Sequence, residues 1–208
     1  MLDYGTMDET DEKGNVMGDF SASDINIQGS FSYLLTEYWS GGVTAKAIMS
    51  NYGEYSSMAM GVDLALNYYN EEKGFSLSAV GKNLGGQIDP LYDEKQSLPF
   101  DFAIGFSKVL ANAPIRVSLT ADDLTHWDDV KFIEHLVLGA EILPSRNTWL
   151  AVGYNFRRAN EMEIAEKSHG AGWSFGGGIN VKKIKVGVGY GKYHVGASSL
   201  LLNLALTL

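Results

Sequence analysis

The stretch SLLLNLALTL, Ser199 to Leu208, decides the fold class of this chain. Leucine occupies every second position from Leu200 to Leu208, and Ser, Leu, Asn, Ala and Thr alternate with it. A period of two is typical of a β-strand with one apolar face. Soluble sandwiches contain such strands too, but a chain that ends on one without a polar tail is typical of outer-membrane barrels, whose last strand faces lipid. The stretch therefore predicts a membrane β-barrel.

The composition fits this class and argues against several others. The 208 residues are 45% hydrophobic and include 24 glycines and 4 prolines, which suits many short strands better than a helical bundle or a disordered chain. Cysteine is absent, so neither a disulfide framework nor a thiolate metal site is expected. A formal net charge of -9 argues against nucleic acid as a partner, because phosphates require a basic face.

Period-two segments recur along the rest of the chain. The cleanest runs from Met58 to Tyr68, where Met, Val, Leu and Tyr alternate with Ala, Gly, Asp and Asn. The segments expected to be strands cover residues 1–7, 25–35, 43–49, 58–68, 75–82, 100–106, 115–119, 136–142, 150–156, 173–181, 184–190 and 199–208. They predict an all-β chain, a transmembrane antiparallel β-barrel domain over residues 1–208 with about twelve strands of roughly the length that a tilted membrane strand needs.

The connections between these segments are expected to alternate between long and short. The long ones cover residues 8–18, 85–98, 121–131 and 157–170. Outer-membrane barrels have short periplasmic turns and long outer loops. Counted backward from the last strand, the turns Asn70–Gly74 and Lys182–Lys183 fall in the periplasm. The acidic loops around Asp8, Tyr92, Trp127 and Glu161 then lie outside.

Two further patterns favour the membrane over the alternative, a soluble up-and-down barrel or sandwich. Aromatic pairs at Tyr38–Trp39 and Tyr68–Tyr69 stand at strand ends beside short turns, where an aromatic girdle is expected. Isolated charges also occur on the polar face, and they suit a polar lumen better than a dry core. These charges are Asp63, Lys82, Asp101, Arg116 and Glu141.

The sequence shows neither a long apolar run nor the pattern of a signal peptide. No stretch of about 18 apolar residues predicts a membrane-spanning helix. Acidic residues follow Met1 at once, which does not resemble a signal peptide. For an outer-membrane protein we therefore expect an N-terminal part that precedes this sequence.

The densest group of metal-ligand residue types is Asp122, Asp123, His126, Asp128 and Asp129. Carboxylates of this kind bind hard cations such as calcium, but the spacing matches neither an EF-hand nor a zinc motif. We expect a solvated loop in which Trp127 packs or contacts a partner, and no metal site.

Catalysis and cofactor binding find no support. The four histidines are far apart, and no serine lies in a G-x-S-x-G elbow. The stretch GWSFGGG (Gly172 to Gly178) lacks the lysine of a phosphate loop and is typical of a strand that needs small residues on one face. Carboxylate pairs such as Glu71–Glu72 and Glu161–Glu163 are expected to be solvating charges in exposed loops. We predict that the protein is not an enzyme and has no cofactor.

Four stretches carry a resemblance to a known family. They are KNLGGQ (Lys82 to Gln87), LPFDFAIGFSKVLANAPIRVSLTADDLTHWD (Leu98 to Asp128), LAVGYNFRR (Leu150 to Arg158) and GAGWSFGGGINVKKIKVGVGYGKYHVGASSLLLNL (Gly170 to Leu204). They resemble the PorQ family of outer-membrane proteins from the type IX secretion system of Bacteroidota. KNLG is shared with barrels similar to the long-chain fatty acid transporter, and the second stretch favours PorQ over the sibling PorV.

The resemblance implies a barrel of about fourteen strands, of which this chain looks like the C-terminal portion. Leu208 departs from the aromatic residue that usually ends such barrels. The last strand is then expected to be an open edge in this chain, prone to aggregation.

The resemblance also implies partners. PorQ-like proteins hold the surface protein PorZ at the outer membrane, in an attachment complex with PorU and PorV. Outer loops would then carry the function, and exposed loop aromatics are typical interface anchors. We expect Tyr92, His126, Trp127 and Asp128 to touch the surface partner, and outer-membrane lipid to surround the barrel. The alternative is an outer-membrane transporter of hydrophobic small molecules.

Overall fold

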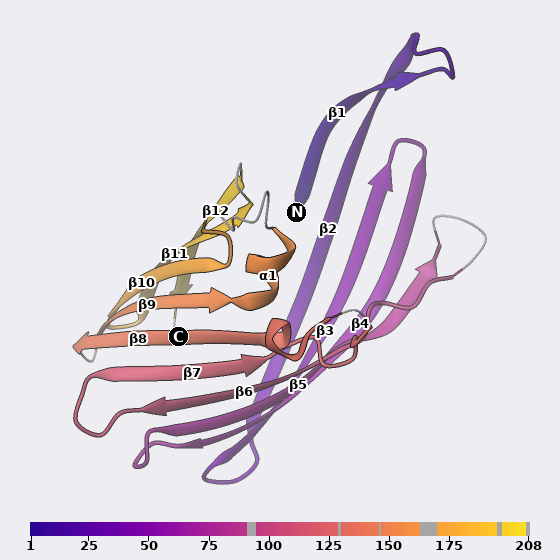
Figure 1. Cartoon of the computed structure of the whole chain (residues 1–208). Coiled ribbons are helices and arrows are strands. Elements are labelled where there is room, and N and C mark those ends of the chain that lie inside the picture. The colour runs from indigo at the N-terminus through magenta and orange to yellow at the C-terminus, as the bar shows by residue number, and fades with distance from the viewer. Residues whose placement is uncertain (91–94, 129, 146, 163–169, 195–196, 207–208) are drawn as a thin grey trace. The chain divides into compact units, whose positions relative to one another are not determined.

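The structure, a computed structural model, describes residues 1–90, 95–128, 130–145, 147–162, 170–194 and 197–206 (Figure 1). It is all-β, with 72% of the described residues in strands. The strands are β1 (Leu2–Thr10), β2 (Val16–Leu34), β3 (Trp39–Tyr52), β4 (Tyr55–Asn70), β5 (Phe75–Asp89), β6 (Asp101–Val109), β7 (Ile115–Ala121), β8 (Leu136–Ser145), β9 (Thr148–Asn155), β10 (Trp173–Val181), β11 (Ile184–His194) and β12 (Ala197–Leu206). A short 3-10 helix, η1 (Phe132–His135), and a short α-helix, α1 (Phe156–Glu161), lie in two of the connections.

All twelve strands form one sheet in chain order, from β1 at one edge to β12 at the other. Each strand follows its predecessor through a turn or loop, so neighbours run antiparallel (Figure 1). The predicted number of strands and their antiparallel pairing are confirmed. The sheet is not closed, so a complete barrel stays a prediction.

The chain divides into two compact units. One comprises Met1–Leu66 and Val80–Asp101, and the other comprises Asn67–Ala79 and Phe102–Leu208. The boundary between the units crosses β4 after Leu66 and β5 before Val80. The end of β4 and the start of β5 belong to the second unit, and the rest of both strands belongs to the first. The hairpin turn that joins these two strands therefore belongs to the second unit.

The register of the β10–β11 hairpin shows how alternation builds two different faces. Phe175 lies opposite Tyr190, and two positions on Gly177 lies opposite Val188. The positions between them are glycine on both strands, with Gly176 opposite Gly189. Successive side chains point to opposite faces of a strand. One face of the hairpin is therefore bulky and apolar, and the other is small.

The bulky apolar face is the exposed one. In the first unit, Met60 and Leu64 of β4 are exposed, whereas Ala59 next to Met60 is buried. In the second unit, Leu202 and Leu204 of β12 expose 76% and 77% of their surface. The only buried hydrophobic residues among those described are alanines, namely Ala22, Ala59, Ala103, Ala159 and Ala171. The arrangement is the reverse of a water-soluble protein, in which large apolar side chains are buried.

The expected long loop at residues 8–18 is wrong. β1 continues to Thr10, β2 starts at Val16, and only a tight turn separates them. The Asp11 carboxylate accepts hydrogen bonds from the backbone N–H groups of Lys13 and Asn15, at 2.9 and 2.8 Å, and Gly14 takes the positive φ of +83° that the turn requires. Acidic residues here lie on a solvated hairpin rather than in a loop.

Three long connections remain, and all follow strands that run in the same direction: β5–β6, β7–β8 and β9–β10. The expected loop at residues 157–170 contains α1, which alternation of apolar residues did not predict. Asn155 starts this helix, because its side chain accepts a hydrogen bond from the Arg158 N–H at 2.9 Å. Gly172 lets the following chain approach, since a Cβ there would lie 2.6 Å from the Asn155 carbonyl oxygen. Neither helix among the described residues has the length and apolar run needed to cross a membrane.

Candidate functional site

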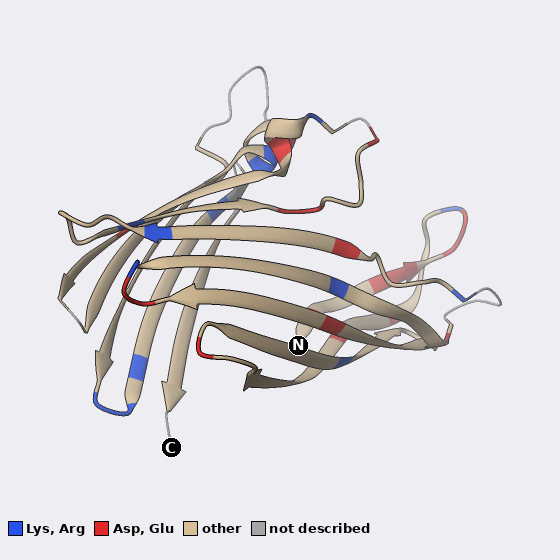
Figure 2. Cartoon of the chain, turned by 90° about the horizontal axis from the view of Figure 1, so that it is seen from below, with Lys and Arg blue, Asp and Glu red and all other residues tan. Residues whose placement is uncertain are grey.

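The charges on the polar face form ion pairs between neighbouring strands. Arg116 of β7 lies directly opposite Glu141 of β8, and their side chains meet at 2.9 Å. The Lys82 ammonium lies 2.9 Å from a carboxylate oxygen of Asp101. Asp63 also has a partner, Lys46, which the sequence had not singled out. Figure 2 shows that charged residues are sparse along the strands and more frequent in the connections.

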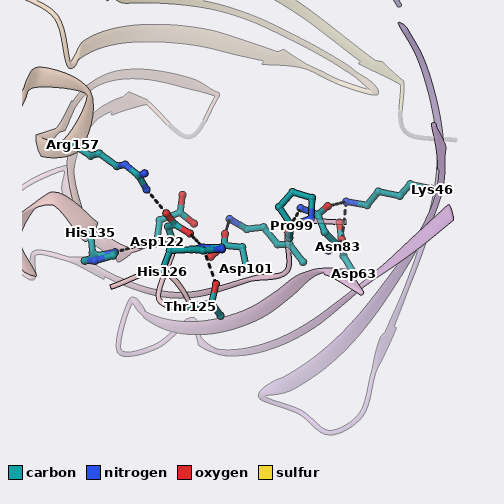
Figure 3. Close-up of polar contacts among 12 residues, drawn as sticks. Lys46, Asp63, Asn83, Pro99, Asp101, Asp122, Thr125, His126, His135 and Arg157 are labelled. Carbon is teal, nitrogen blue, oxygen red and sulfur yellow. Dashed lines mark hydrogen bonds and ion pairs between the residues drawn. The ribbon is translucent and has the colours of Figure 1, made fainter. Parts of the chain in front are cut away.

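Lys46 and Asp63 belong to a hydrogen-bonded network around Asn83, the second residue of the KNLG stretch. The Lys46 ammonium lies 2.7 Å from Asp63 Oδ1 and donates to the Asn83 side-chain oxygen, also at 2.7 Å (Figure 3). The Asn83 backbone has a positive φ of 61°, and its N–H donates to Asp63 Oδ1 at 2.7 Å. The Asn83 amide group donates in turn to the Pro99 carbonyl at 2.9 Å. Asparagine tolerates this backbone conformation better than most residues, and these hydrogen bonds hold Asn83 in it.

On the polar face, two glycines of β10 leave room for the side chain of Trp149 from β9. The indole lies over Gly176 and Gly178 of β10, and a Cβ at Gly178 would lie only 2.7 Å from Trp149 Nε1. The GWSFGGG stretch is therefore a strand that needs small residues, as predicted. Beside this indole is a pocket of about 350 Å³, which Leu201 and Lys185 also line.

The β7–β8 connection carries three exposed apolar side chains. Trp127, Phe132 and Ile133, which we call the Trp127 patch, expose 50%, 66% and 49% of their surface. The Trp127 and Phe132 rings are stacked, with centroids 6.5 Å apart and an interplanar angle of 13°. Exposed aromatic clusters on loops are typical protein-binding surfaces.

A hydrogen bond and a contact with the buried His135 ring fix the orientation of Trp127. Its indole N–H donates to the Leu124 carbonyl at 2.8 Å, and its ring centroid lies 4.3 Å from that of His135. His135 is 1% exposed, and its Nδ1 donates to the Asp122 carbonyl at 2.9 Å. The backbone N–H of Asp122 donates back to the His135 carbonyl at 2.8 Å. The loop therefore closes on a buried histidine, and the exposed indole has a fixed orientation.

An ionic cluster joins this loop to α1. Asp123 accepts a hydrogen bond from His126 Nδ1 at 2.5 Å and forms an ion pair with Arg157 of α1. Figure 3 labels the His126 and Arg157 side chains. Arg157 also binds Glu161, one turn along the helix, at 2.6 Å. We call these residues the Asp123 cluster. Near it, Asn160 of α1 donates to the Glu134 carboxylate of η1 at 2.8 Å. Two connections that are separate in sequence thus form one surface.

The pKa values in the Asp123 cluster reflect this pairing. Burial alone would raise the pKa of Asp123, but hydrogen bonds from His126 and Arg157 and their positive charges outweigh it and hold the pKa below its ordinary value. Hydrogen bonds to Glu161 and Asp123 raise the pKa of Arg157. The Asp123 carboxylate and the Arg157 guanidinium are therefore both charged at neutral pH.

The expected partner-binding residues are placed as follows. His126, Trp127 and Asp128 are consecutive exposed residues of the β7–β8 connection. Tyr92 lies outside the described residues. The sequence analysis missed Phe132 and Arg157. The apolar pair Phe132–Ile133 between a polar loop and a strand could have indicated Phe132. Nothing in the sequence links Arg157 to Asp123.

The acidic constellation of the sequence separates into different roles. Asp123 and His126 bind each other, the Asp122 backbone binds His135, and Asp128 is exposed. Asp129 lies outside the described residues. Within the described ranges, no three metal-binding side chains gather around one point.

Neither a protein-family model nor a curated protein matches the chain.

Proposed function

We propose that the protein is an outer-membrane β-barrel component of a type IX secretion system that anchors a surface protein through its long connections. The sheet supplies the membrane anchor, and the β7–β8 connection supplies the binding surface. The motifs that resemble the PorQ family support this system and a PorZ-like partner, within a complex that also holds PorU and PorV. Anchoring of this kind needs neither a cofactor nor a catalytic residue.

The observation that carries the proposal is the inverted burial of the sheet. Large apolar side chains cover the exposed face, while the opposite face carries alanine, glycine and paired charges. Contiguous apolar surface of this extent is not tolerated in water and marks contact with lipid or protein. Strands that alternate between an apolar and a polar face are the pattern of transmembrane barrels.

Fractionation followed by a pull-down tests the proposal. The tagged full-length protein is expressed in its own cells and recovered from outer membranes in detergent. The expected result is recovery in the membrane fraction together with a surface protein of the attachment complex. Recovery in the soluble fraction without detergent would contradict the membrane assignment, and recovery from membranes with no surface protein bound would contradict the anchoring role.

The pocket beside Trp149 favours a second candidate, transport of hydrophobic small molecules. Its lining combines Trp149 and Leu201 with Lys185, which suits an amphipathic anion. Under this alternative, Trp149→Ala lowers the uptake of a labelled fatty acid several-fold and leaves the surface partner bound. If removal of the protein abolished uptake but Trp149→Ala left uptake unchanged, the pocket would be rejected as the transport site.

A further inference from the structure

The Trp127 patch combines exposure with a fixed orientation of its indole. The indole N–H is hydrogen-bonded to Leu124, and the ring rests on the buried His135. A side chain that is already ordered loses little conformational entropy when a partner covers it. Tryptophan in such a position is among the residue types that most often dominate binding energy at protein interfaces.

The rim of the patch is acidic. Asp128 is exposed next to Trp127, and Glu134 is partly exposed next to Ile133. Lys131 is the exposed base beside them. Carboxylates are repelled by anionic lipid headgroups, so this rim disfavours insertion of the patch into a lipid surface. A protein surface with basic residues around an apolar socket is complementary to it.

We propose that the Trp127 patch is the docking surface for the surface partner, which receives Trp127 and Phe132 in an apolar socket bordered by lysine or arginine. This inference rests on the proposed anchoring function and specifies where and how that partner binds. Arg157 is a positioning residue: through Asp123 it ties the patch-bearing loop to α1 without lying in the patch itself.

Alanine substitutions test the contact residues. The full-length protein and its variants are purified from outer membranes, and their affinity for the partner recovered with the wild type is measured. Trp127→Ala is expected to weaken binding about 30-fold, the usual effect at an interface hot spot, and Phe132→Ala by a smaller factor. The matched control is Trp39→Ala, at the start of β3 beside a short turn, which should change affinity by less than about 3-fold.

Two further sets of variants test the acidic rim of the patch and the positioning role of Arg157. Asp128→Asn combined with Glu134→Gln should slow association several-fold and flatten the dependence of the association rate on salt. Arg157→Ala should weaken binding less than Trp127→Ala does, and Arg157→Lys should recover part of the loss because it keeps a positive charge near Asp123. A variant that no longer reaches the outer membrane is replaced by the milder Trp127→Leu.

The outcomes separate this inference from the function on which it rests. Loss of affinity in Trp127→Ala with normal membrane recovery supports it. Wild-type affinity in both Trp127→Ala and Phe132→Ala, while the partner still binds, overturns the docking surface and leaves the anchoring function standing. Lower membrane recovery of both variants with unchanged affinity would place the patch in lipid and also overturn the inference. If the wild type itself binds no surface partner, the anchoring function has failed.

Discussion

Two regions of the second unit expose large apolar side chains, but they do so in different ways. On β11 and β12, Val188 and Leu202 lie opposite each other in rows of similar aliphatic residues. In the β7–β8 connection, Trp127 is held by a hydrogen bond and a buried ring. Rows of aliphatic side chains suit contact with lipid, because a fluid apolar solvent does not require its neighbours to have a particular side-chain orientation. A fixed aromatic group matches one surface of fixed shape, so exposure alone does not distinguish the two roles.

The largest effect should follow from a charge placed in the aliphatic rows. Val188→Arg puts a guanidinium at the middle of β11, where lipid contact would make it cost about 2–4 kcal/mol. We expect poor recovery from outer membranes and a lower urea midpoint in detergent. Gly189→Arg is the matched control on the opposite face, where a Cβ has only an ordinary contact, 3.8 Å from Leu201. Equal losses in both variants would contradict a lipid-facing row.

A smaller effect is expected on the polar face. Lys46→Met leaves the Asn83 side-chain oxygen without its donor and Asp63 without its cation, so unfolding in detergent should become easier by about 1–3 kcal/mol. Adding Asp63→Leu to this variant removes the stranded carboxylate and should recover part of the loss. A double variant as unstable as the sum of the two single variants would show that the pair is not coupled.

The more exposed pair on the same face should matter less. Arg116 and Glu141 side chains retain 38% and 33% of their exposure, so solvent screens their attraction. Arg116→Gln should change the free energy of unfolding by less than about 1 kcal/mol, and high salt should remove the difference. A loss as large as that of Lys46→Met would mean that this pair lies away from water.

The smallest effect is local to the Asp123 cluster. Because the pKa of Asp123 is held below its ordinary value, its contribution is complete above a pH of about 4 and is lost as the pH falls through the folded-state pKa. The protection factors of the amides in residues 122–128, which correct for the intrinsic pH dependence of exchange, should therefore fall on acidification while the strands stay protected. Asp123→Asn should show fast exchange already at neutral pH and little further change with acid.

The strands were predicted well from the sequence, because the alternating pattern that identifies a strand lies within the strand itself. A period of two identifies a strand and both of its faces, and it located β10 from Trp173 to Val181 with the correct bounds. It failed at β1 and β2, because polar residues on an exposed hairpin resemble those of a loop. It also failed at α1, where a capping asparagine and not an apolar pattern starts the helix.

The candidate site was predicted in part for a similar reason. Trp127 stood out as an aromatic residue in a polar loop. Its support by His135 and the tie from Asp123 to Arg157 join residues 8 and 34 positions apart, and such contacts depend on how loops fold over one another. No local pattern encodes them. Tyr92, predicted on the same grounds as Trp127, stays a prediction.

Among the described residues, every buried hydrophobic residue is an alanine, and this has a thermodynamic consequence. Heat-capacity change on unfolding arises chiefly from apolar surface that moves from a dry core into water. In the described residues of this chain that surface already lies outside the sheet, so unfolding in detergent or lipid should transfer little of it to water. Its stability curve should accordingly be flat with temperature, with hydrogen-bond enthalpy rather than hydration setting the midpoint, and calorimetry of the reconstituted protein would measure the slope directly.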